Sequence, residues 1–124
     1  MVSDNALVDK TISFSIRIVK CYNYLQDEKK EFVMSKQLLR SGTSIGANVH
    51  EAIFAQSRAD FVSKMNIALK EANETSYWLL ILSKTAYLES NVYISLRQDI
   101  DEIIRILIST LKTTRKNEKY INGE

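Results

Sequence analysis

The chain has 124 residues, and its 17 basic and 15 acidic side chains leave a formal net charge of +2. This length fits one domain that can bury its own core. The sequence contains no proline and only three glycines. Sandwiches and barrels use both residue types in their many turns, so the composition excludes those folds and favours a few long helices.

Apolar residues recur at steps of three and four through four segments, which is the spacing of amphipathic helices. We expect helices over about 4–25, 32–55, 58–86 and 91–116, followed by a frayed tail over 117–124. Ser57, followed by Asp60, is the expected N-cap of the third helix. Short connections between rods of similar length make neighbouring helices antiparallel. The predicted fold is therefore all-α, a single domain over 1–124 built as an antiparallel up-down-up-down four-helix bundle.

The apolar segments and the cysteine content predict the compartment of the protein and whether it contacts a membrane. The N-terminal segment lacks the apolar core of a signal peptide, and no stretch reaches the ~18 uncharged apolar residues of a membrane span. The single cysteine, Cys21, allows no intramolecular disulfide, which fits a reducing compartment. We expect a cytoplasmic protein with no membrane partner.

Three of the four helices carry more apolar surface than one bundle core requires. The first helix has two apolar faces, one with Ile12 and Ile16 and the other with Phe14 and Ile18. Large exposed apolar patches mark interaction sites, so we interpret the excess as an interface between copies of the chain. The alternative is that broad apolar faces simply occur in compact bundles. The expected interface residues are Ile67, Trp78, Ile81, Ile104 and Ile108.

The second helix contains the segment QLLRSGTSIGANVHEA over 37–52. Gly42 and Gly46 lie one turn apart, and small residues let another helix backbone approach closely. A backbone-lined groove for a ligand is the alternative. We expect Asn48 to form a hydrogen bond across a helix contact and to fix its register. The residues of this packing signature are Gly42, Ser44, Ile45, Gly46, Asn48 and Glu51.

This segment, continued by MNIALKEANETSYWLLIL, resembles the four-helix-bundle family of 23S rRNA intervening-sequence proteins. The resemblance covers about residues 10–112. It implies a closed bundle that forms a ring-shaped homopentamer. It also implies a distant relation to the accessory variability proteins of diversity-generating retroelements, which act beside a reverse transcriptase and have basic surfaces suited to nucleic acid. His50 departs from the family pattern, since members commonly carry a small residue there.

The sequence offers little for catalysis. His50 is the only histidine, and Glu51 projects to another side of the same helix, so the two form no oriented dyad. No Glu-x-x-His pair of the kind that holds metals in helix bundles occurs. We therefore expect no enzymatic activity, no metal and no cofactor.

Basic residues on three helices leave nucleic-acid contact open. In one copy they are ordinary surface charges, whereas in a ring each group repeats and phosphate neutralisation adds up. We expect a homo-oligomeric accessory protein that contacts RNA or DNA, with a nucleic-acid enzyme as a further partner. The alternative is a helical adaptor that binds a protein through apolar surface. The candidate phosphate contacts are Lys10, Arg17, Lys20, Lys36, Arg40, Lys112, Arg115 and Lys116.

Overall fold

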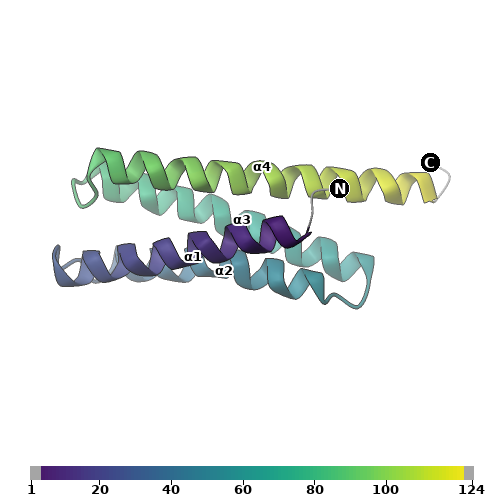
Figure 1. Ribbon diagram of the computed structural model, residues 1–124, viewed down its shortest axis with the longest axis horizontal. Coiled ribbons are helices and arrows are strands. Elements are labelled where there is room, and N and C mark those ends of the chain that lie inside the picture. Colours follow the sequence, from purple (N-terminus) through teal and green to yellow (C-terminus); the bar gives the residue numbers. More distant parts are fainter. Residues whose placement is uncertain (1–3, 122–124) are drawn as a thin grey trace.

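Four helices make up most of the computed structural model, which describes the backbone of residues 4–121 and the side chains of 6–117. They are α1 (Asp4–Asp27), α2 (Met34–Ile53), α3 (Arg58–Lys84) and α4 (Ser90–Ile121). Each helix runs antiparallel to the next, and no strand occurs over 4–121 (Figure 1). The predicted all-α up-down bundle is confirmed.

The helix ends differ from the predicted ones by a few residues, most of all in α4. This helix reaches Ile121, so residues 117–121 are helical where fraying was expected, while 122–124 lie outside the described residues. From Ser90 to Asn122 the sequence contains no glycine or proline, and the lysines and arginines near the end of α4 are good helix formers. The end of α3 comes earlier than predicted, at Lys84, because Ala86 adopts the left-handed conformation with φ of 67°.

Two side-chain caps set the start of α2 and α3. The Ser57 hydroxyl accepts a hydrogen bond from the Asp60 backbone N–H at 3.1 Å, as predicted for α3. The Asp60 carboxylate accepts from the Gln56 N–H at 3.4 Å instead of the Ser57 N–H that a capping box would use. At α2 the cap is the Glu31 carboxylate, which the sequence did not indicate.

The Glu31 cap satisfies three backbone donors of the first turn of α2. Its two oxygens accept from the N–H groups of Val33, Met34 and Ser35 at 3.0, 2.9 and 2.7 Å. The Ser35 hydroxyl donates back to the Glu31 carbonyl oxygen at 2.8 Å. Burial alone would raise the pKa of the Glu31 carboxyl, but the three N–H donors outweigh it and hold that pKa below its ordinary value.

The core runs along the whole bundle and consists of the predicted apolar stripes. The apolar residues of α4 at steps of three and four are all buried: Leu96, Ile100, Ile103, Leu107 and Leu111. Most apolar residues at the same spacing on α2 and α3 are buried too. On α1 the buried face is the one with Phe14 and Ile18, and the face with Ile12 and Ile16 points outward. The largest fully buried side chains include Phe14, Ile18, Leu38, Ile45, Met65, Leu79, Leu96, Ile100 and Leu107.

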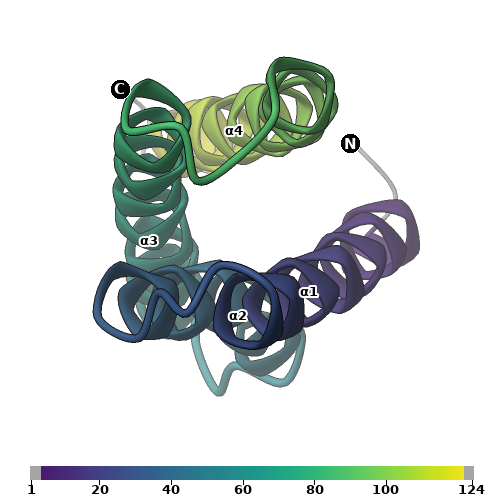
Figure 2. The same ribbon diagram turned by 90° about the vertical axis from the view of Figure 1, so that its left-hand side faces the viewer.

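Helices that follow each other in the chain pack closely together. The contact between α1 and α4, which completes the bundle, is looser. Figure 2 agrees, since α4 is set apart from α1 while the other neighbouring helices lie side by side. Two ion pairs bridge this seam between α1 and α4: Lys10 to Glu102 at 2.6 Å and Arg17 to Asp99 at 2.5 Å. Across the described residues, no helix has the length and apolar character needed to traverse a lipid bilayer.

Candidate interaction surfaces

The outward side of α1 carries an apolar stripe of Val8, Ile12, Ile16 and Val19, which we name the outer stripe. Ile12 and Ile16 are each 52% exposed, and Val19 is 41% exposed. Their spacing of three and four residues places them on one side of the helix. A continuous row of half-exposed aliphatic side chains on one helix is typical of a surface that another molecule covers.

The five residues predicted as an oligomer interface on α3 and α4 are less exposed than Ile12, Ile16 and Val19 of the outer stripe. Ile67 and Ile108 are 38% exposed, and the other three are half-buried. Trp78 packs partly against the core, and its indole N–H donates to the Glu74 carboxylate at 3.0 Å. The half-buried members are Trp78, Ile81 and Ile104. The most exposed apolar stripe on a helix face thus lies on α1, outside the predicted set.

Three of the eight candidate phosphate contacts are held in ion pairs within the chain. Lys10 and Arg17 form the two pairs across the seam. Arg40 binds both Glu71, at 3.1 Å, and Glu74 on α3. A cation with a carboxylate partner is less available to phosphate, because a new contact must displace the existing one.

The other five candidates form no ion pair with any residue whose side chain the structure describes: Lys20, Lys36, Lys112, Arg115 and Lys116. All five are exposed. The structure does not bring them into one patch. Lys20 and Lys36 lie toward the end of the bundle where α1 passes into α2, whereas the three α4 residues lie toward the opposite end (Figure 1).

Gly42 and Gly46 lie where α2 crosses α1. Of the two interpretations, close helix packing and a ligand groove, their position supports close packing. A Cβ at Gly42 would meet Ile18 Cγ2 at 2.8 Å and Cγ1 at 2.9 Å. At Gly46 it would meet the Ser15 hydroxyl at 3.3 Å and Thr11 at 3.4 Å. The segment is filled by α1 side chains and leaves no room there for a ligand.

The other residues of the signature also face neighbours within the chain. Ile45 is fully buried, and the Ser44 hydroxyl donates to the Arg40 carbonyl at 2.6 Å. Glu51 is exposed and pairs with Lys64 of α3 at 3.4 Å.

The prediction for Asn48 was wrong. Its side-chain amide donates to the Ser44 carbonyl of the same helix at 2.8 Å and forms no cross-helix bond among the described residues. Asn48 lies at the edge of the buried stripe, where it reaches its own preceding turn more easily than α1 or α3. The buried polar contact between helices is instead that of Ser41 on α2 with Thr75 on α3, whose hydroxyl oxygens are 2.9 Å apart.

The side chains that could support metal or acid–base chemistry are scattered. His50 is exposed and packs edge-on against Phe54 with 5.2 Å between ring centroids. Within the described part of the chain, no group of three or more His, Cys, Asp or Glu side chains is arranged to hold a metal ion. Cys21 is buried, and burial raises the pKa of its thiol to about 11 despite the opposing effect of Arg17.

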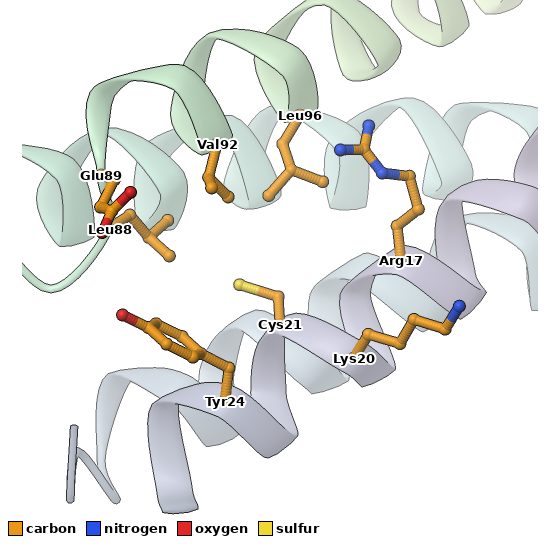
Figure 3. A pocket seen from close by; sticks show the side chains of 8 residues that line it. All are labelled: Arg17, Lys20, Cys21, Tyr24, Leu88, Glu89, Val92 and Leu96. Atoms are coloured by element: carbon orange, nitrogen blue, oxygen red, sulfur yellow. The ribbon is translucent and has the colours of Figure 1, made fainter. Parts of the chain in front are cut away.

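A pocket of about 420 Å³ opens in the seam between the last turns of α1 and the first turns of α4. We name it the seam pocket. It lies where α1 and α4 pack loosely and where α1 carries the small Cys21 between the larger inward residues Ile18 and Leu25. The sequence alone does not indicate this pocket, since the only sign of it there is one small residue in an apolar stripe. Its lining consists of Arg17, Lys20, Cys21, Tyr24, Leu88, Glu89, Val92 and Leu96 (Figure 3).

Fold and surfaces together define a small antiparallel four-helix bundle with an exposed apolar stripe and exposed basic residues. The sequence matches the family of 23S rRNA-intervening sequence proteins over residues 3–109, and the chain belongs to this family.

The chain is similar to a solved structure from Bacteroides thetaiotaomicron VPI-5482, described as a protein with unknown function from the S23 ribosomal protein family. It shares 59% sequence identity with a TM-score of 0.87, over 88% of this chain and 97% of that one. Comparison with curated proteins gave no match.

Proposed function

We propose that this protein is a non-enzymatic bundle that assembles into a ring-shaped homopentamer and contacts RNA or DNA through exposed basic residues. In this role it is an accessory to a nucleic-acid enzyme. The observation that carries the proposal is the outer stripe, because a single copy leaves it facing water.

Covering the outer stripe favours assembly by the hydrophobic effect. Ile12 and Ile16 each keep about half of their surface exposed. Full burial of such a side chain contributes roughly 1.5–3 kcal/mol relative to exposure, so burying the remaining half of several of them gives a substantial part of a stable contact.

The position of a second apolar surface favours a ring over a two-fold dimer. Ile67 on α3 and Ile108 on α4 are the most exposed of the predicted interface residues. α1 and α3 occupy diagonal positions in the bundle, and their backbones do not approach closely (Figure 2). Two different patches on different sides of one molecule are what a head-to-tail contact requires, and such contacts form a ring when the rotation between copies closes. The number five comes from the family resemblance and is the part that mass measurement tests.

Exposed cations without carboxylate partners support nucleic-acid contact. Lys112, Arg115 and Lys116 project from the C-terminal part of α4. In a ring this group recurs once in every copy, so weak individual phosphate contacts add up and binding becomes strongly salt-dependent. Lys10, Arg17 and Arg40 have a smaller part in the proposal because each already pairs with a carboxylate.

Native mass spectrometry and sedimentation test the assembly. We expect one species of five copies for the wild type and smaller species for Ile12→Glu/Ile16→Glu. Phe54→Glu is the matched control, because Phe54 is also an exposed apolar residue but lies beyond the end of α2. A wild-type protein that sediments as a monomer at micromolar concentration would refute the assembly.

Fluorescence anisotropy with structured RNA and with duplex DNA tests the second part. We expect binding at low salt that weakens when Lys112, Arg115 and Lys116 are changed to glutamate. Lys70→Glu serves as a control on an exposed lysine of α3. An assembled protein that binds neither nucleic acid at low salt would contradict this part and would favour the adaptor, in which the apolar surface binds a protein partner.

A further inference from the structure

We propose that the seam pocket binds a small amphiphilic carboxylate, whose apolar body packs on Cys21, Val92 and Leu96 and whose anionic group lies beside Lys20 and Arg17. This site includes neither the outer stripe nor the basic residues of α4, on which the proposed function mainly rests. Lys20 and Arg17 are also candidate phosphate contacts, so the test below measures carboxylate binding directly and uses no nucleic acid.

The size and depth of the pocket suit a small molecule. Its volume of about 420 Å³ falls within the roughly 300–1,000 Å³ of known ligand pockets. Leu88 and Leu96 are nearly inaccessible in the core, so the base of the pocket reaches the interior of the bundle. The entrance lies between α1 and α4, the most loosely packed pair of neighbouring helices.

The centre of the pocket is apolar. In Figure 3 the Cys21 side chain points from α1 into the space that Val92 and Leu96 face from α4. Because burial raises the pKa of the Cys21 thiol to about 11, this side chain is uncharged at neutral pH and behaves as a small apolar group. An aliphatic or aromatic body fits this centre, and a nucleophilic role for the thiol does not.

The α1 side of the pocket is positively charged and partly preorganised. The Arg17 guanidinium is fixed by Asp99 at 2.5 Å and by the Ser95 hydroxyl at 2.9 Å. A guanidinium has five N–H donors, so this geometry leaves donors for a further acceptor. Lys20 adds a cation that no described carboxylate neutralises. A carboxylate is the simplest group that satisfies both.

The opposite end of the pocket sets the direction of the ligand. Glu89 lies there beside Leu88, away from Arg17 (Figure 3). A carboxylate at that end would be repelled, whereas at the Lys20 end it is attracted. The pocket thus distinguishes an anionic amphiphile, which can orient its charge toward Lys20, from a cationic one that would have to approach Glu89.

Cys21 is the only cysteine, so its modification reports on the pocket without a label. We would measure the rate at which N-ethylmaleimide modifies Cys21 at mildly alkaline pH, with decanoate, 1-decanol or decyltrimethylammonium present. Decanoate should slow the reaction in a saturable manner and at lower concentration than the alcohol. Equal protection by the cation, or an unchanged or faster reaction with decanoate, would overturn the proposal.

Three variants locate the effect. Lys20→Glu should raise the decanoate concentration for half-protection about fivefold, as expected for loss of one exposed charge contact and its replacement by repulsion. Lys70→Glu, the same change at an exposed lysine of α3, should leave it unchanged. Val92→Trp should fill the pocket, so that modification is slow without decanoate and decanoate slows it no further. If Lys20→Glu and Lys70→Glu behave alike, the carboxylate does not bind beside Lys20 and the assignment is wrong.

Discussion

The hydroxyl oxygens of Ser41 and Thr75 lie 2.9 Å apart in the centre of the bundle, and both residues are completely inaccessible to water. Thr75 Oγ1 also lies 2.8 Å from the Glu71 carbonyl oxygen of its own helix. Two small hydroxyl residues thus replace apolar side chains at facing core positions of α2 and α3. Their hydrogen bond is satisfied only when the two helices are in this register.

Thr75→Val keeps the shape of the side chain and leaves the Ser41 hydroxyl without this partner. We expect it to lower the free energy of unfolding by about 1–3 kcal/mol, the cost of an unsatisfied buried polar group. In the double variant Ser41→Ala/Thr75→Val the free energy of unfolding should fall by less than the sum of the decreases in the two single variants, since both polar groups are removed together. Urea unfolding of the four proteins measures this, and strictly additive losses would mean that the hydroxyls are not coupled.

Gly42→Ala tests the close crossing of α1 and α2. Alanine is the better helix former by about 1 kcal/mol, so an open site would be stabilised. At Gly42 the added methyl would lie 2.8 Å from Ile18 Cγ2, and we expect a net loss of about 1–3 kcal/mol from overpacking. In an Ile18→Ala background the same change should become neutral or stabilising.

Gly46→Ala is the matched comparison for that variant. Its Cβ would meet the Ser15 hydroxyl at 3.3 Å, and a serine side chain can rotate away. We expect a smaller loss than at Gly42, measured by the same thermal or urea unfolding. Equal losses at both glycines would show that backbone effects, not the contact with Ile18, dominate.

Gly42 and Gly46 also explain why the sequence predicts the helices but not the buried face of α1. Apolar periodicity alone was enough for the four helices and for the core stripes of α2, α3 and α4. It could not decide which apolar face of α1 is buried, because both faces carry large aliphatic residues. The choice depends on a fit between helices: Ile18 packs over Gly42 and Thr11 lies beside Gly46, so the opposite face, with Ile12 and Ile16, is left outside.

The features that sequence analysis missed depend on three-dimensional detail. The Glu31 cap requires the turn before α2, in which Lys30 adopts φ of 53°. The seam pocket depends on the loose closure of α1 against α4, which helix periodicity does not encode. The Ser41–Thr75 contact did leave a signal, since both residues interrupt apolar stripes at core spacing.

Glu31→Gln tests the cap of α2. Loss of the charge at three backbone donors should lower the free energy of unfolding by about 1 kcal/mol at neutral pH, as for other helix caps. Since the folded pKa of Glu31 is depressed below 4.5, its contribution is present above that pH and is lost as the pH falls through the folded value. The difference between wild type and Glu31→Gln should therefore shrink below about pH 4.5 in urea unfolding measured across pH. A difference that stays constant down to the acid transition would show that charge is not what makes Glu31 an effective cap.

Cys21 should make the free energy of unfolding decrease as the pH rises, whereas Glu31 makes it decrease as the pH falls. Its thiol has a folded pKa of about 11 against an ordinary value of 9.0, mainly because burial disfavours the thiolate. A group that holds its proton more tightly when folded contributes stability below its unfolded pKa and loses it as the pH rises to the folded value. Relative to Cys21→Ala, which does not titrate, the wild type should lose about 2–3 kcal/mol between pH 9.0 and about 11, since one pKa unit corresponds to about 1.4 kcal/mol. Urea unfolding of both proteins at several pH values measures the difference, in which the shared titration of lysines and tyrosines cancels. A difference independent of pH would mean that the thiolate is as well accommodated in the seam pocket as in water, and that the apolar character assigned to the centre of the pocket is wrong.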